Sequence, residues 1–149
     1  MIDKEVTKQK ILKNEIIESD MMENELVVKP INFPELGLPA GPYSHAVIHG
    51  NTLYTSGMTA FGTQAQEDSI SEQTKEVFRQ IEFMAKAVGS SLSKLIKVTI
   101  FLTDLSDMKA LRQTLSDIYQ THLPASSLIK IEALFSEDLK VEVEAILAI

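Results

Sequence analysis

Apolar and polar residues alternate most regularly near the end of the chain, between residues 139 and 149. The even positions Lys140, Glu142 and Glu144 are polar. The odd positions are all apolar, namely Leu139, Val141, Val143, Ala145, Leu147 and Ile149. A period of two is typical of a strand with one buried face. Together with the break at Pro124, it predicts a strand, a short turn and a long closing strand between His122 and Ile149.

Two short strands and a long helix are predicted in the middle of the chain. Residues 46–48 and 52–56 flank the turn residues His49-Gly50-Asn51, which favours a hairpin. A helix is expected from Ser69 or Ser71, because Ser69 and Glu72 have capping-box spacing and apolar residues follow at helical spacing. Gly89 supplies the left-handed residue that commonly ends a helix.

The remaining elements complete an α+β pattern. The β-branched residues in 97–102 predict a strand, and residues 107–119, with Ser106 as the cap, predict a second helix. Prolines and glycines between residues 30 and 42 predict an irregular lead-in, and 61–68 a mobile loop. The order strand, strand, helix, strand, helix, strand, strand predicts a mixed sheet with two helices packed on one face.

The first 30 residues are treated as an N-terminal extension, and residues 31–149 as a single domain. Residues 1–24 are rich in charge, with Ile11, Leu12, Ile16 and Ile17 in a loose helical stripe. This pattern predicts a frayed or weakly docked amphipathic helix. Two alternatives stay open: a helix that binds a partner, or an upstream extension of a protein whose translation starts at Met21 or Met22.

Composition narrows the classes of function. The 149 residues carry a formal net charge of −7 without a basic stripe, which argues against nucleic-acid binding. The absence of cysteine excludes disulfides and thiolate chemistry and suits the cytoplasm. No apolar run is long enough for a membrane span or a signal-peptide core. No metal-ligand spacing or nucleotide-binding motif is found.

The candidate functional side chains have ordinary structural interpretations as well. His49 and His122 are expected in a turn and at a helix end, and alternation can place His45 in solvent. Glu142 and Glu144 are two residues apart on one strand and therefore share a face, which is either a solvated surface or a reactive pair. Arg112 lies on a helix rich in acids and amides and is either a surface residue or a ligand-binding cation.

Several motifs together resemble the Rid family, also called YjgF-type or L-PSP-like, over residues 36–149. They are GPYSHAV (41–47), GNTLYTSG (50–57), AVGSSLSKLIKVTIFLTDLSDM (87–108), HLPASSLIKIEAL (122–134) and VEVEAI (141–146). The resemblance implies a chorismate-mutase-like α+β fold and a homotrimer with a cleft between neighbouring subunits. It also implies hydrolysis of enamine or imine intermediates to 2-keto acids and ammonia, without metal or cofactor.

The resemblance also implies roles for particular residues. Tyr43 would line the cleft, Ser56 matches the serine of the TSG motif, and Glu142 would position the attacking water. The arginine that clamps the substrate carboxylate does not carry over, because Ser126 stands in its place. A neutral hydroxyl forms weaker hydrogen bonds to a carboxylate than a guanidinium, so we expect at least a ~10-fold weaker hold on an amino-acid-derived imine.

A second difference from the family concerns Arg112. Relatives that keep the clamping arginine often have asparagine where this chain has Arg112. Arg112 is therefore expected to reach into the same cleft and supply the missing cation. The hypothesis requires that Arg112 points toward Ser126 and Glu142.

Three functions are compatible with the sequence. The first is a hydrolytic deaminase similar to 2-iminobutanoate/2-iminopropanoate deaminase, with an atypical substrate because of Ser126. The second is a non-catalytic trimer that binds a small metabolite such as a 2-keto acid. The third, a translation inhibitor or endoribonuclease, is disfavoured by the acidic charge. A cation next to Glu142 would favour the enzyme.

Overall fold

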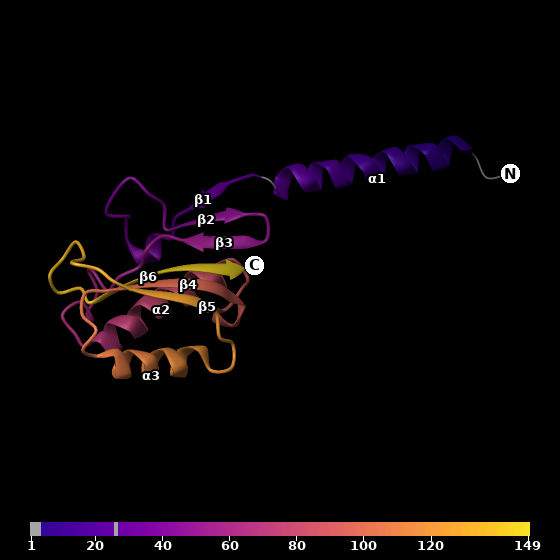
Figure 1. Cartoon of the computed structure of the whole chain (residues 1–149). Helices are drawn as coiled ribbons and strands as arrows, with labels where there is room; N and C mark the ends of the chain where they lie inside the picture. Colours follow the sequence, from indigo (N-terminus) through magenta and orange to yellow (C-terminus); the bar gives the residue numbers. More distant parts are fainter. Residues whose placement is uncertain (1–3, 26) are drawn as a thin grey trace.

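The computed structural model describes residues 4–25 and 27–149, and its body is a six-stranded sheet covered on one face by two helices (Figure 1). The strands are β1 (Lys29–Ile31), β2 (Ala46–His49), β3 (Thr52–Thr55), β4 (Leu95–Leu102), β5 (Ala125–Lys130) and β6 (Val141–Ala148). The helices are α1 (Lys4–Glu25), α2 (Ile70–Ala87) and α3 (Met108–Tyr119), with short 3₁₀ turns at Pro34–Leu36 and Leu92–Lys94.

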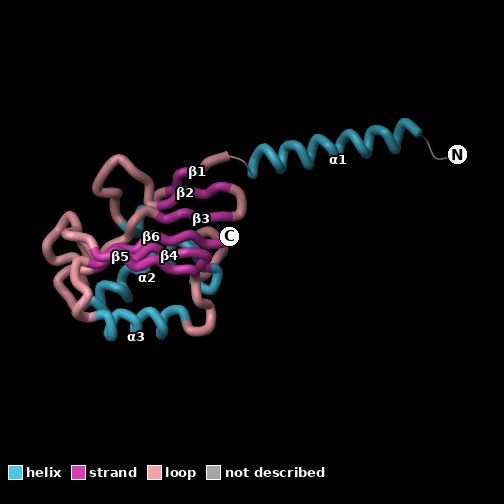
Figure 2. Tube along the Cα trace, viewed as in Figure 1, coloured by secondary structure: helices cyan, strands magenta, loops and turns pink. Residues whose placement is uncertain are grey.

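The closing strand β6 lies in the middle of the sheet, whose order is β1-β2-β3-β6-β4-β5. It pairs antiparallel with β3 on one side and with β4 on the other. Only β4 and β5 are parallel, and α3 is the helix that connects them (Figure 2). The predicted mixed α+β sheet is confirmed.

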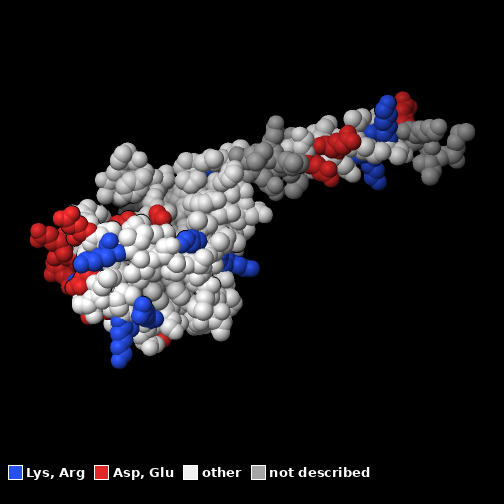
Figure 3. Space-filling view, in the orientation of Figure 1, with Lys and Arg blue, Asp and Glu red and all other residues white. Residues whose placement is uncertain are grey.

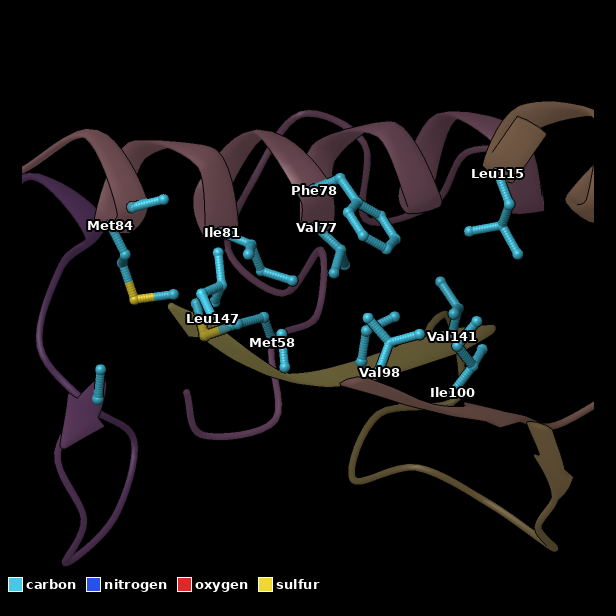
Figure 4. Close-up of a cluster of buried hydrophobic side chains, with 14 of the residues drawn as sticks. Met58, Val77, Phe78, Ile81, Met84, Val98, Ile100, Leu115, Val141 and Leu147 are labelled. Carbon is cyan, nitrogen blue, oxygen red and sulfur yellow. The ribbon is translucent and has the colours of Figure 1, made fainter. Parts of the chain in front are cut away.

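The core lies between the sheet and the two helices. The odd residues of β6 and the residues Val98, Ile100 and Leu102 of β4 point toward α2, where Val77, Phe78, Ile81 and Met84 meet them (Figure 4). Leu111 and Leu115 of α3 join the same cluster. Burial of each large side chain stabilises the fold by roughly 1.5–3 kcal/mol. The opposite face of the sheet is not covered by any described element, and we call it the open face.

Most predicted elements are found, with local corrections. The Ser69 hydroxyl accepts a hydrogen bond from the Glu72 backbone at 3.3 Å, and Gly89 has a φ of +79°. Ser106 does not cap α3, because the helix starts after Asp107 and the Asp104 carboxylate instead accepts from the Ser106 backbone. The turn predicted between the last two strands is the longer segment 131–140.

The first strand was missed, and the predicted domain boundary at residue 30 falls inside it. Lys29, Pro30 and Ile31 pair with Ile48, Val47 and Ala46. The position suits Pro30, because β1 is an edge strand. Proline has no backbone N–H to donate, and on the outer side of an edge strand no donor is needed. The strand is only three residues long, so it has too few positions for a period to be recognised.

The N-terminal helix is present, but it is not amphipathic. It projects away from the sheet, and its side chains between residues 5 and 19 are all exposed (Figure 1). At about 100° per residue, Val6, Ile11, Leu12, Ile16 and Ile17 point around the whole circumference of α1. Without an apolar stripe the helix has no face with which to dock on the core. No described helix has the length and apolar content to cross a bilayer.

A buried glutamine of α2 connects the residue that precedes β6 to the helix layer by a hydrogen bond. Gln73 of α2 is fully buried, and its Nε2 donates to the carbonyls of Gln66 and Asp138 at 2.7 and 2.8 Å. Its Oε1 accepts from the backbone N–H of Lys140 at 2.9 Å. One side chain therefore satisfies backbone groups of two loops that would otherwise be buried without partners.

We predict that Gln73→Leu lowers the free energy of unfolding by about 2–4 kcal/mol, because it removes the partners of several buried backbone groups. Urea denaturation followed by circular dichroism measures the change. The control is Gln113→Leu, which alters an exposed glutamine bonded only to Asp117 and should change stability by less than about 0.5 kcal/mol. Equal losses in the two variants would contradict the role given to Gln73.

Candidate functional site

A bulge in the pairing of β3 with β6 brings Gly57 against Glu142. The ladder runs to the pair Tyr54–Ile146 and resumes at the bridge Met58–Val143, with N···O distances of 2.8 and 3.0 Å. Three residues of one strand, 55–57, thus oppose two residues of β6, 144 and 145. The extra residue bends the chain, and bulges of this kind often redirect side chains at functional sites.

The contact explains why residue 57 is glycine. A Cβ atom built on Gly57 would lie 2.7 Å from Cδ and 3.0 Å from Cγ of Glu142. The Glu142 side chain therefore lies directly against the main chain at residue 57.

Glu142 is half-buried on the open face, and its neighbour Glu144 lies on the same face. The register places Glu142 opposite Phe101 and Glu144 opposite Thr99 of β4, which confirms that the two carboxylates share a face. Burial raises the pKa of Glu142, and the negative charge of Glu144 raises it further. A carboxyl group with a raised pKa is a stronger base once ionised, which suits proton transfer near neutral pH.

Tyr43 and Ser56 lie close to Gly57. Tyr43 is half-exposed and lines a hollow of about 100 Å³ whose wall includes Gly57 and Met58. The Ser56 hydroxyl donates to the carbonyl of Ser44 at 2.6 Å, so it fastens the GPYSHAV segment to the end of the hairpin. The structure therefore brings Tyr43, Ser56 and Glu142 together around Gly57.

His45 is buried rather than solvated, which corrects the sequence-based expectation. The ring nitrogen Nδ1 of His45 accepts a hydrogen bond from the Phe33 backbone N–H at 3.0 Å. The backbone N–H of His45 donates to Oδ1 of Asn32 at 2.9 Å. Nδ1 therefore carries no proton, and burial lowers the pKa of the imidazole. Alternation failed here because His45 precedes β2 and packs on Phe33 in the core.

Ser126 and Arg112 do not meet Glu142 within one chain. Ser126 pairs with Val98, a buried residue on the helix-covered face, whereas Glu142 lies on the open face. Arg112 is an exposed residue of α3, in the helix layer. The sheet thus separates both residues from Glu142 of the same chain, so the condition set for the Arg112 hypothesis is not met within a single subunit.

Sequence reasoning missed a lysine on the open face. Lys97 donates from Nζ to the Ser127 hydroxyl at 2.6 Å, and it lines a hollow of about 260 Å³ with Tyr54, Thr99 and Glu144. Alternation in residues 97–102 could have placed Lys97 and Thr99 on the face of the acids, because Val98 and Ile100 are clearly core residues.

No group of histidine, cysteine and acidic residues in the described part of the chain has the geometry of a metal site. The residues found next to the Glu142 carboxylate are Gly57 and Glu144, which do not form a set of metal ligands with it. The arrangement is a half-buried carboxylate beside exposed main chain and a tyrosine. It can orient or deprotonate a water molecule near a small hollow.

Comparison with known proteins defines the class of protein. The model of the endoribonuclease L-PSP family matches residues 35–149. A 2-iminobutanoate/2-iminopropanoate deaminase from Dermatophagoides farinae is 30% identical over 122 residues, covering 80% of this chain and 94% of its own. The mitochondrial protein mmf2 of Schizosaccharomyces pombe is 35% identical over 123 residues, covering 80% and 96%.

A solved structure agrees with these relatives. The crystal structure of the yeast protein YEO7 superimposes with a TM-score of 0.75 at 29% identity, covering 82% of this chain and 98% of that one. The chain therefore belongs to the Rid/YjgF family of endoribonuclease L-PSP-like proteins, as the motifs indicated. Helix α1 precedes the matched residues. Because two relatives are named as mitochondrial proteins, a cytoplasmic location stays a prediction.

We predict that Gly57→Ala displaces the Glu142 carboxylate toward solvent and lowers its raised pKa, because the new methyl group occupies the place of that side chain. Carbon-detected NMR titration of labelled glutamate measures the pKa. Gly41→Ala is the control, since its methyl group would contact Tyr43 and not Glu142. An unchanged Glu142 pKa in Gly57→Ala would show that the contact does not hold the carboxylate.

Proposed function

We propose that this protein hydrolyses reactive imines and their enamine tautomers to carbonyl compounds and ammonia, with Glu142 as the general base. The observation that carries the proposal is the half-buried Glu142 carboxylate with a raised pKa beside Gly57. Similarity to an imine deaminase at 30% identity supports the reaction type.

The proposed reaction needs only this carboxylate and water. Glu142 accepts a proton from water while the water oxygen adds to the C=N carbon, and the nitrogen ends as an amine. Glu142 then returns its proton to the nitrogen of the carbinolamine, and the C–N bond breaks so that ammonia leaves. The hydroxyl proton passes to water as the carbonyl group forms. A protonated imine is already electrophilic, so the proposal requires no metal or cofactor.

The proposed site is shared between subunits of a homotrimer. The open face of the sheet, which includes Tyr54 and Ile146, has no cover among the described elements and would be buried between subunits. Tyr43, Ser56 and Glu142 come from one subunit. Ser126 and Arg112, on the other side of the sheet, come from its neighbour, where Arg112 supplies a cation and Ser126 a neutral hydrogen bond to the substrate.

A non-catalytic trimer that binds a small metabolite is the second candidate. It is favoured by the lack of an arginine or lysine paired with Glu142 in the described part of a single chain. Endoribonuclease activity, suggested by the name of the family, is the weakest candidate. The net charge is −7, and acidic side chains gather over the loop between β5 and β6, which contains Glu132, Glu137 and Asp138 (Figure 3).

We predict that the protein hydrolyses 2-aminoacrylate faster than buffer does, with a loss of about 100-fold or more in Glu142→Gln. The test is semicarbazide-trapping kinetics with the imine generated in situ. Glu144→Gln should move the acidic limb of the pH profile to lower pH, because removing the neighbouring charge lowers the pKa of Glu142.

The control for this charge change is Glu18→Gln, an exposed residue of α1, whose pH profile should match the wild type. Full activity in Glu142→Gln would refute the role of Glu142. Equal hydrolysis rates with and without the protein, for every imine tested, would favour the metabolite-binding alternative.

We predict that mixing inactive subunits restores activity, because each site takes Glu142 and Arg112 from different chains. Glu142→Gln and Arg112→Ala trimers are unfolded together and refolded as a one-to-one mixture. Random assembly leaves about one quarter of the sites with both side chains intact. Sedimentation equilibrium checks the trimer, and refolding each variant alone is the control. A monomer, or a mixture as inactive as its parts, would contradict the shared site.

A further inference from the structure

Four exposed apolar side chains gather around the hollow beside Gly57. Leu38, Tyr43, Phe61 and Phe135 are 93, 50, 50 and 64% exposed, and all four line this hollow. They come from three separate loops. Large apolar side chains are seldom left exposed together unless they contact a ligand or a partner. We call these four residues the apolar rim.

Phe61 and Phe135 form the firmest part of the rim. Their ring centroids are 5.0 Å apart, and the rings meet edge to face at 67°. Aromatic pairs favour this arrangement. Gln66 links the two loops, since its Oε1 accepts from the Gly62 backbone at 2.8 Å and its Nε2 donates to the Asp138 carboxylate at 3.3 Å. The pair is therefore held in place by the protein itself.

The rim and the proposed base share one wall. Gly57 lines the hollow, and the Glu142 side chain lies against the same residue. A substrate whose C=N carbon lies at Glu142 therefore has two apolar surfaces nearby, Phe101 on the facing strand and, past Gly57, the rim. Because Ser126 offers only a neutral hydroxyl where the resemblance expects an arginine, contacts with the rim would add to the affinity that the proposed Arg112 of the neighbouring subunit supplies.

We propose that the preferred substrates are imines with an aromatic or large aliphatic side chain, which packs on Phe61 and Phe135. This inference rests on the proposed hydrolase function and specifies its substrate class. The reaction is unchanged: water adds to the C=N carbon, and ammonia leaves. Burying a phenyl group on this rim should raise kcat/KM about 10- to 100-fold over that of a methyl side chain.

The experiment compares two imines under identical trapping conditions. An amino-acid oxidase generates the imine of phenylalanine or the imine of alanine, and semicarbazide competes with the protein for each. The measured quantity is the ratio of kcat/KM for the phenylalanine imine to kcat/KM for the alanine imine. We expect a ratio of about 10 or more for the wild type and a fall of about 10-fold in Phe135→Ala and in Phe61→Ala.

Ile11→Ala is the control, because it removes an exposed apolar side chain of α1 far from the rim, and its ratio should equal that of the wild type. A wild-type ratio near one, with both imines hydrolysed, overturns the inference while the hydrolase proposal stands. Failure to hydrolyse either imine overturns the hydrolase proposal itself. Loss of the oligomer in Phe135→Ala, measured by sedimentation, overturns the inference by making the rim a subunit contact.

Discussion

The whole domain depends on the strand β6, because it is paired on both edges. One of its faces packs in the core, and the other carries the acidic side chains of the site. Its odd residues, from Val141 to Leu147, are buried against the helices. Its even residues include Glu142 and Glu144 on the open face. A shift of one residue in its register would exchange the two faces and bury the carboxylates. The packing of the core therefore fixes where the proposed base lies.

The site contains one irregularity in the sheet, and this irregularity alters the pKa of the proposed base. The bulge at 55–57 lets Gly57 lie against Glu142, and the resulting burial raises the pKa of the carboxyl group. A raised pKa in the folded state means that the neutral form is favoured. The associated stabilisation is present at low pH and is lost as the pH rises through the folded-state value. Once ionised, Glu142 opposes folding, as is common for residues kept for function.

Much of the fold could be predicted because its signals are local. Alternation identified β6, helical spacing identified α2, and Ser69 and Gly89 marked the ends of that helix. Residues 29–31 were missed, because a three-residue edge strand containing a proline has no period. For α1, apolar content was mistaken for an apolar face. In the site, the sequence indicated Tyr43, Ser56 and Glu142, but it contained no signal for the Phe61–Phe135 pair, whose members are 74 positions apart and meet only through tertiary structure.

The electrostatics of the open face and the apolar rim favour the same kind of substrate. Glu142 and Glu144 place two carboxylates on one face, and Lys97, the nearby cation, donates a hydrogen bond to Ser127. A substrate carboxylate near Glu142 would add a third negative charge without a guanidinium from the same chain to balance it. A protonated imine brings a positive charge to Glu142, and a bulky apolar side chain finds Phe61 and Phe135 at the shared wall. The charges of the open face and the exposure of Phe61 and Phe135 within one chain are thus consistent with the proposed preference for a cationic imine that carries an apolar side chain.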